Sequence, residues 1–201
     1  FGFTGIYFFF IEQLQKIEAA DSTYDTNYFL GMSHYGNNNY FNAIKYLKKV
    51  YQKDSTSLSN IYYLGNAYGE CFNSPKAIEY LNKGICIAQK VDSVLYNFYM
   101  TLSTAYHTEK KYKEEITALS EAYKRMPTHL LLLYKIGSIY DIEMKDEQNT
   151  KYYLELFISK IQQGVKDKYE KTGKDVDQMY LLSAKRRLDE LKEKKLAQKN
   201  K

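Results

Sequence analysis

Apolar, small and aromatic positions repeat along the chain with a period close to 34 residues. An aliphatic residue followed by a small one occurs four times, at Leu30-Gly31, Leu64-Gly65, Leu102-Ser103 and Ile136-Gly137. Successive small residues are separated by 34, 38 and 34 positions. An internal period of this length predicts a chain built from repeated supersecondary units that stack on one another.

Other positions keep the same phase relative to the small residue. Three residues after it stand His34, Tyr68, Tyr106 and Tyr140. Twelve residues after it stand Ala43, Ala77, Glu115 and Asn149. Leu47, Leu81, Leu119 and Tyr153 follow at sixteen residues, and Val50, Gly84, Ala122 and Leu156 at nineteen. Glu115 and Asn149 depart from the expected alanine, so the fourth copy is the weakest match.

This arrangement resembles the tetratricopeptide repeat family, in which each repeat is a pair of antiparallel helices, A and B. The resemblance implies an all-α, right-handed superhelix of four repeats at 24–57, 58–95, 96–129 and 130–163. Glycine inside a helix costs about 1 kcal/mol relative to alanine, and close approach of helix B is the expected compensation. Pro127 ends the third repeat because proline cannot continue a helix. The signature positions are Gly31, Ala43, Gly65, Tyr68, Ala77, Ser103, Tyr106, Ala122, Pro127, Gly137 and Tyr140.

The two ends of the chain carry partial elements. Residues 1–23 predict a helix B without its helix A, because Ile11, Leu14 and Ile17 stand 33 positions before Ile44, Leu47 and Val50. Residues 164–201 predict a polar linker and then a basic helix from Val176 to Ala197. Its apolar side, which we expect to cover the last repeat, carries Met179, Tyr180, Leu188 and Leu191.

The second repeat contains four more residues than the others. Four residues are close to one helical turn. We therefore expect its helix B to be the longer one, from about Pro75 to Gln89.

Composition and charge agree with a helical protein. The 201 residues include only 10 glycines and 2 prolines, with 22 tyrosines and no tryptophan. The net charge of +5 lies entirely in residues 185–201, because 8 of the 29 basic and 3 of the 24 acidic residues fall there. The balanced remainder argues against a broad nucleic-acid-binding face. We therefore expect nucleic acid to be an unlikely partner. The alternative is that nucleic acid or an acidic partner binds through the basic C-terminal helix.

Candidate catalytic and metal-binding residues are scarce. His34, His107 and His129 fall in different repeats, and His34 occupies the tyrosine-type packing position. No glycine-rich phosphate loop or nucleophile with a partnering base is visible. Cys71 and Cys86 are expected about 20 Å apart, too far for a disulfide, and both free and partly buried. We predict no enzyme activity, no metal site and no cofactor.

The resemblance also implies a binding surface, because helix A of each repeat lines a concave groove in this family. Carried over position by position, the groove residues are Tyr28, Met32, Tyr35, Tyr62, Asn66, Met100, Thr104, His107, Tyr134, Ser138 and Asp141. Family members that hold a chaperone's C-terminal carboxylate use Lys, Arg and Asn here. Tyr28 and Met32 replace the first Lys and Asn, which argues against a carboxylate clamp. Tyrosine offers a large contact area with a polar tip, which suits peptide capture.

The hypothesis from the sequence is a non-catalytic scaffold that binds an extended peptide or a helix in this groove. One alternative is a homo-oligomer formed through the aromatic start, Phe1 to Phe10. The eleven apolar residues at the start are too few to span a bilayer, which needs about 20. The Tyr-, Lys- and Asn-rich composition resembles repeat proteins of the Bacteroidetes, many of which carry export signals. Periplasmic, cell-envelope and cytoplasmic locations all stay open.

Overall fold

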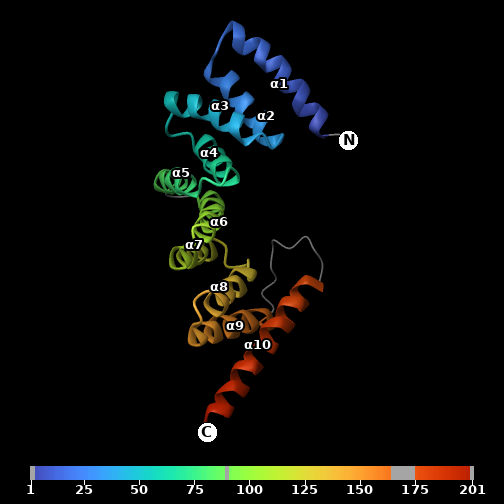
Figure 1. Cartoon of the computed structure of the whole chain (residues 1–201), viewed down its shortest axis with the longest axis vertical. Coiled ribbons are helices and arrows are strands. Elements are labelled where there is room, and N and C mark those ends of the chain that lie inside the picture. The colour runs from blue at the N-terminus through green and yellow to red at the C-terminus, as the bar shows by residue number, and fades with distance from the viewer. Residues whose placement is uncertain (1–2, 89–90, 164–174, 200–201) are drawn as a thin grey trace. The chain divides into compact units, whose positions relative to one another are not determined.

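The structure is a computed structural model that describes residues 3–88, 91–163 and 175–199 (Figure 1). Within these ranges the regular structure is entirely helical. The helices are α1 (Phe3–Ala20), α2 (Tyr24–Gly36), α3 (Tyr40–Lys53), α4 (Leu58–Glu70), α5 (Ser74–Ile87), α6 (Asp92–Thr108), α7 (Tyr112–Arg125), α8 (Leu131–Ile142), α9 (Glu147–Gln162) and α10 (Asp175–Lys199). The all-α class predicted from the sequence is therefore confirmed. The polar linker predicted before the last helix lies largely outside the described residues.

The chain forms two compact units, Phe1–Lys110 and Lys111–Lys201. We call them the N-terminal and C-terminal units. In the N-terminal unit α2 pairs with α3 and α4 with α5, while α1, α4 and α6 pack on the helix preceding or following them in the chain. In the C-terminal unit α8 pairs with α9, and α7 and α10 flank this pair. The boundary falls between α6 and α7, inside the predicted third repeat.

Among the described residues, four of the turns between consecutive helices contain one left-handed residue. Asn38, Phe72, Lys110 and Lys145 have φ between 54° and 57°. After three of these turns an Asn or Asp side chain caps the next helix by accepting a hydrogen bond from a backbone N–H three residues later. Such caps satisfy donors that the first helical turn leaves free. The N-capping residues are Asn39, Asn73 and Asp146.

Glycines in helix A lie against a leucine of helix B. A Cβ atom on Gly31 would lie 2.6 Å from Leu47 Cδ2, and one on Gly65 would lie 2.9 Å from Leu81 Cδ2. Contacts under 3.0 Å require the neighbour to move, so only glycine permits this helix separation. The small residue in the middle of helix A thus has the packing role that its spacing suggests.

The fourth helix pair differs by one residue from the sequence prediction. A Cβ on Gly137 would lie 3.0 Å from Leu154 Cδ2, whereas the predicted partner at this position was Tyr153. The buried residues of α9 are Thr150, Leu154 and Phe157, each one position later than predicted. The α8–α9 turn contains one extra residue, because its left-handed residue lies eight positions after Gly137. The corresponding distance after Gly65 is seven, which accounts for the shift.

The extra residues of the second repeat do not lengthen its helix B. The helix α5 has 14 residues, the same as α3 and α7. Instead α6 has 17 residues, compared with 13 in α2 and in α4. The prediction of a long helix B was therefore wrong. The added turn of α6, residues 92–95, buries Leu95, so burial of apolar surface favours extending this helix.

Stacked rings lie close to the turn in three hairpins, and in the α8–α9 hairpin they are the rings of Tyr140 and Tyr153, 5.6 Å apart at 18°. The rings of Tyr68 and Tyr80 are 5.5 Å apart with an interplanar angle of 8°, and those of His34 and Tyr46 are 5.5 Å apart at 3°. His34 is only 4 % exposed, and burial lowers its pKa. It is therefore neutral at pH 7 and packs as an aromatic core residue. This agrees with its place in the tyrosine position of the repeat.

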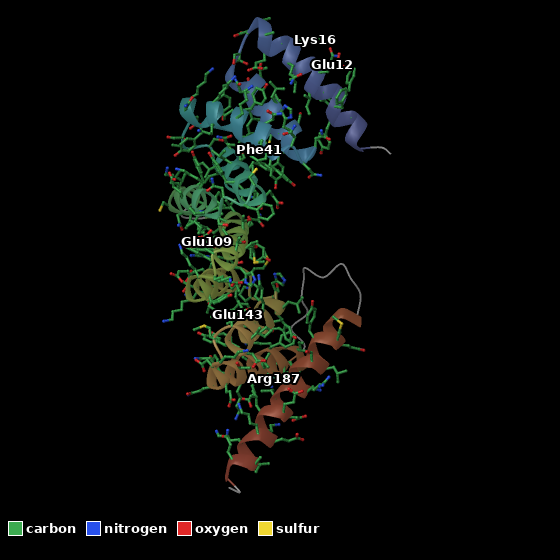
Figure 2. The ribbon with its side chains drawn as sticks, in the orientation of Figure 1. Glu12, Lys16, Phe41, Glu109, Glu143 and Arg187 are labelled. Atoms are coloured by element: carbon green, nitrogen blue, oxygen red, sulfur yellow. The ribbon has the colours of Figure 1, made fainter. Side chains whose placement is uncertain are left out.

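The first helix, α1, packs on the rest of the unit with one side and leaves apolar side chains exposed on another. It packs on α2, and Ile11 is buried. Glu12 and Lys16 form an ion pair of 3.0 Å one turn apart on its exposed side (Figure 2). Phe9 and Phe10, 60 % and 53 % exposed, have edge-to-face rings.

Candidate peptide-binding groove

In the N-terminal unit, helix A of each repeat exposes side chains beside helix A of the next repeat. The helices α2, α4 and α6 contact one another in this order. The hydroxyl of Tyr28 on α2 donates to Ser59 Oγ on α4 at 3.3 Å. On α4, Asn66 Oδ1 accepts a bond of 3.4 Å from Thr101 Oγ1 of α6. These polar links join side chains that do not take part in the glycine–leucine crossings.

An aromatic pocket of about 420 Å³ lies between the first halves of α4 and α6. Its lining residues are Leu58, Ser59, Tyr62, Tyr63, Val94, Asn97 and Phe98. The Tyr62 ring lies 5.4 Å from Phe98 and 5.6 Å from Tyr63, in edge-to-face geometry. Such contacts hold the rings in place.

A second pocket of about 430 Å³ lies between the last halves of the same helices, and we call it the polar pocket. Its lining residues are Asn66, Gly69, Glu70, Phe72, Ser74, Ala77, Met100, Thr101, Thr104, Ala105 and Thr108. Asn66 Nδ2 donates to the Tyr62 carbonyl at 2.8 Å, which orients the amide. The wall of this pocket therefore combines hydroxyl and amide groups with one carboxylate, Glu70.

Tyrosines of α2 continue the surface next to the aromatic pocket. The Tyr35 ring lies 5.2 Å from Tyr63 and 5.5 Å from Tyr40. Burial, followed by nearby tyrosines and Glu70, raises the pKa of Tyr35 to about 12. The phenol therefore remains protonated at physiological pH and can donate a hydrogen bond.

The structure places the predicted groove residues unequally. Tyr62 lines the aromatic pocket, and Asn66, Met100 and Thr104 line the polar pocket. Tyr28, Met32 and Tyr35 lie on α2, and His107 lies near the end of α6; none of the four lines these two pockets.

The structure adds lining residues that the sequence comparison did not select. These are chiefly Tyr63, Glu70, Phe98, Thr101 and Thr108. Two of them stand four positions after predicted groove residues, since Glu70 follows Asn66 and Thr108 follows Thr104. Residues four apart share one face of a helix. This spacing was the signal available to find them.

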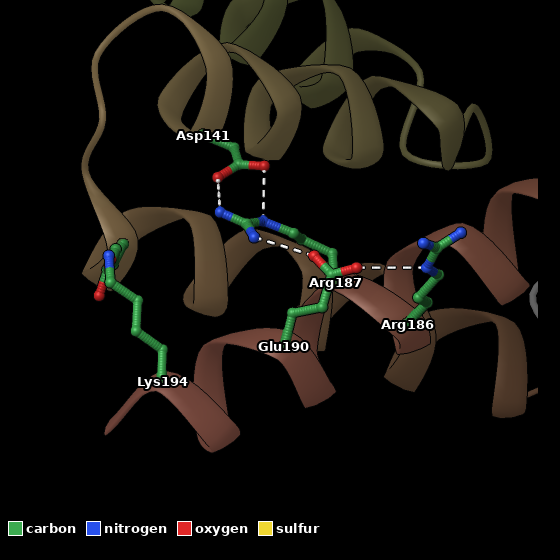
Figure 3. A network of polar contacts seen from close by, with 6 residues as sticks. Asp141, Arg186, Arg187, Glu190 and Lys194 are labelled. Atoms are coloured by element: carbon green, nitrogen blue, oxygen red, sulfur yellow. Dashed lines mark hydrogen bonds and ion pairs between the residues drawn. The ribbon is translucent and has the colours of Figure 1, made fainter. Parts of the chain in front are cut away.

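In the C-terminal unit, helix α10 covers the predicted groove residues of α8. The Tyr134 hydroxyl and Ser183 Oγ lie 3.0 Å apart, and the Tyr134 ring is 4.9 Å from that of Tyr180. Arg187 donates two hydrogen bonds to the Asp141 carboxylate, of 2.7 and 2.8 Å (Figure 3). Two-pronged pairs of this kind are geometrically specific. Tyr134 and Asp141 thus hold a helix of their own chain.

Helix α10 packs on α9 with the spacing of a helix A. Its buried residues Ala184, Leu188 and Leu191 have the spacing of Leu132, Ile136 and Ile139 in α8. In α8 the small residue Gly137 follows Ile136, whereas at the equivalent position of α10 the exposed Asp189 follows Leu188. Close approach of a further helix is therefore not required, and the helix caps the unit. Met179, predicted on the apolar side, is instead 59 % exposed, because it lies outside this spacing.

Several basic residues of α10 already pair with carboxylates. Arg187 also bonds Glu190, and Arg186 bonds the same carboxylate (Figure 3). Lys192 pairs with Asp189 at 3.0 Å, and Lys194 pairs with Glu147 of α9. These pairs reduce the charge available to a phosphate backbone. Nucleic-acid binding through this helix stays a prediction that the salt dependence of binding would test.

Other chemistry finds little support in the part of the chain that the structure describes. No group of three or more His, Cys, Asp or Glu side chains there could hold a metal ion. Cys71 and Cys86 are both free, but Cys86 is exposed, contrary to the expected partial burial. No helix among the described residues is long and apolar enough to cross a membrane.

Comparisons with known proteins relate this geometry to solved structures. No protein-family description and no curated protein sequence matches the chain. A crystal structure of MamA protein superposes with a TM-score of 0.66 at 23% identity, covering 83% of this chain and 95% of that one. YrrB, described as a TPR protein with an unusual peptide-binding site, gives a TM-score of 0.64 at 17% identity, covering 88% and 81%.

A third structure, the TPR-like repeats of a putative kinesin light chain from Podosopora anserina, has a TM-score of 0.59 at 17% identity. It covers 84% of this chain and 90% of that one. The fold is the tetratricopeptide-repeat fold. The sequence resemblance to this fold is thereby confirmed, and a stacked-repeat fold of this kind is a general scaffold for protein–protein interaction.

Proposed function

We propose that the protein is a non-catalytic scaffold that binds an extended peptide segment along α4 and α6. The observation that carries this proposal is the pair of adjoining pockets between these helices. One is lined by aromatic rings, and the other is lined by threonine hydroxyls and the Asn66 amide. YrrB, which shares the fold, is described as having a peptide-binding site, and this likeness supports the same class of ligand.

The two pockets suit different parts of a peptide. An apolar side chain entering the aromatic pocket would contact the rings of Tyr62 and Tyr63 and leave water. The peptide backbone needs partners for its N–H and C=O groups once water is displaced. Beyond the bonds that these groups make within the chain, the second amide hydrogen of Asn66 can donate, and the hydroxyl oxygens of Thr101 and Thr104 can accept, along the polar pocket. Successive peptide residues rise about 3.3 Å each, so a short extended segment spans both pockets.

The replacement Tyr62→Ala tests this proposal. We expect it to weaken binding of peptides selected from a synthetic array by about 2 kcal/mol, roughly 30-fold, as for a central aromatic anchor. Fluorescence anisotropy with the selected peptides measures the loss. Tyr152→Ala is the matched control, because Tyr152 is an exposed tyrosine of α9 outside both pockets.

Thermal unfolding separates binding from folding in this experiment. Tyr62 is only half-buried, so the melting temperature of Tyr62→Ala should remain within a few degrees of the wild type. Unchanged peptide affinity, or an array that selects no peptide, would contradict the proposal. Unchanged affinity with a sharply lowered melting temperature would assign Tyr62 to the core instead.

A second candidate function is self-association through α1. The exposed fractions of Phe8, Phe9 and Phe10 are 68 %, 60 % and 53 %, and Ile6 and Ile17 are also more than half exposed. Contiguous apolar side chains of this kind mark interaction surfaces on soluble domains. Phe10 stands 33 positions before Ala43, where a small residue permits close helix crossing. A partner here must therefore accept a bulky ring, and a second copy of α1 carries complementary rings of its own.

The double replacement Phe9→Ser with Phe10→Ser tests self-association. If α1 pairs with a second copy, analytical ultracentrifugation should show a dimer for the wild type and a monomer for the variant, because the pairing surface loses its rings. Phe41→Ser is the control, since Phe41 is 80 % exposed on α3. A wild type that is monomeric at all concentrations would remove this candidate.

A further inference from the structure

A third pocket adjoins the polar pocket at the helix turns. It has a volume of about 430 Å³ and is lined by Asn37, Asn38, Asn39, Tyr40, Phe41, Glu70, Cys71 and Phe72. Glu70 and Phe72 line both this pocket and the polar pocket. They therefore form the wall between the groove and the turns. Phe41 lies on the α3 side of this pocket (Figure 2).

The conformation of Phe72 is unusual for its environment. Its φ is 56°, in the left-handed region, which bulky residues rarely adopt. The same turn position elsewhere holds Asn38, a residue that tolerates this region, or lysine. Packing does not compensate the strain, because Phe72 is 88 % exposed. The ring therefore presents an exposed aromatic surface at the edge of both pockets.

The charge at this wall is negative. Neither pocket is lined by a lysine, arginine or histidine among the described residues, and Glu70 is the acidic residue in both. Burial, followed by the negative charge of Glu70, raises the pKa of Tyr40. Aromatic faces beside a carboxylate attract a cation by ring electrostatics and by charge pairing. An acidic ligand would be repelled at the same place.

We propose that Tyr40, Glu70 and Phe72 form an acidic aromatic corner that receives a lysine or arginine side chain of the groove-bound peptide. This inference rests on the proposed peptide-binding function and specifies its ligand as a basic peptide. A peptide that places an apolar side chain in the aromatic pocket continues through the polar pocket to this corner. The selectivity is opposite to that of a carboxylate clamp.

Peptide sets that differ only in charge test the inference. Each peptide from the array is synthesised with Lys, Gln or Glu at every position in turn, and anisotropy gives its affinity for the full chain. At the position that reaches the corner, Lys should bind about three- to five-fold tighter than Gln, as for an exposed ion pair assisted by a ring. Glu should bind weaker than Gln.

Three variants assign this preference to the corner. Glu70→Gln should bring the Lys and Gln peptides to within about two-fold of each other, and Glu70→Lys should reverse the order. Phe72→Asn should reduce the preference without loss of thermal stability, because Asn accepts the left-handed conformation. Asp25→Asn is the matched control. It removes one negative charge, as Glu70→Gln does, but at an exposed site on α2 outside these pockets.

The outcomes distinguish this inference from the function on which it rests. If Lys, Gln and Glu peptides bind equally but Tyr62→Ala abolishes binding, the groove functions and the basic selectivity is wrong. A lysine preference that survives in Glu70→Lys would also overturn the inference. If no peptide binds the wild type, the proposed function fails and the inference fails with it.

Discussion

Replacing Gly84 by alanine should lower the free energy of unfolding by about 2–3 kcal/mol, the upper part of the range for overpacking a filled core. A Cβ at this position would lie 2.0 Å from Phe98 Cε1 and 2.4 Å from Cζ. Phe98 is 1 % exposed, so its ring has no room to move away. In an open helix the same substitution would stabilise by up to about 1 kcal/mol. Packing against Phe98 thus turns a substitution that would stabilise an open helix into one that destabilises this protein.

The control for this experiment is Gly69→Ala in α4. A Cβ there would lie 3.9 Å from its nearest neighbour, Ala77 Cβ, which is ordinary contact. Stability should rise by a few tenths to about 1 kcal/mol, because alanine reduces the entropy of the unfolded chain. Urea unfolding followed by circular dichroism compares the two variants. Equal stabilisation of both would mean that α5 and α6 do not cross closely at Gly84.

The architecture was largely predictable because the repeat imposes packing rules on single positions. Gly31 and Gly65 signalled close crossings, and the structure places each against a leucine. The one-residue shift in α9 was not visible, because counting from Gly137 assumes a turn of constant length. Asp146, which caps α9, marks the true start of that helix. A capping signal would therefore have corrected the count.

The candidate site was less predictable than the fold. Position counting selected Asn66 and Thr104 as groove residues, and the structure places both along one pocket, since they follow helix geometry. It could not reveal that α10 engages Tyr134, because that contact joins residues 49 apart in sequence. Nor could it reveal Phe72, which belongs to a turn rather than to helix A. Long-range contacts and turn conformations carry no periodic signal.

The capping role of α10 gives the second large prediction, the replacement Ala184→Glu. Ala184 is fully buried in a cluster with Leu133, Leu154, Phe157 and Leu188. A carboxylate there would lose water without gaining a partner, so we expect the C-terminal unit to be destabilised by about 3 kcal/mol. The helix would separate from α9, leaving the bond between Asp141 and Arg187 without support from packing.

Limited proteolysis followed by mass spectrometry measures this separation. In Ala184→Glu, cleavage within α10 should be much faster than in the wild type, because a detached helix unfolds locally. Leu182→Glu is the control, since Leu182 lies two residues earlier on the same helix but is 70 % exposed. Its cleavage rate should match that of the wild type. Equal protection of α10 in Ala184→Glu would show that polar contacts alone hold this helix, and that the buried spacing of Ala184, Leu188 and Leu191 does not define a cap.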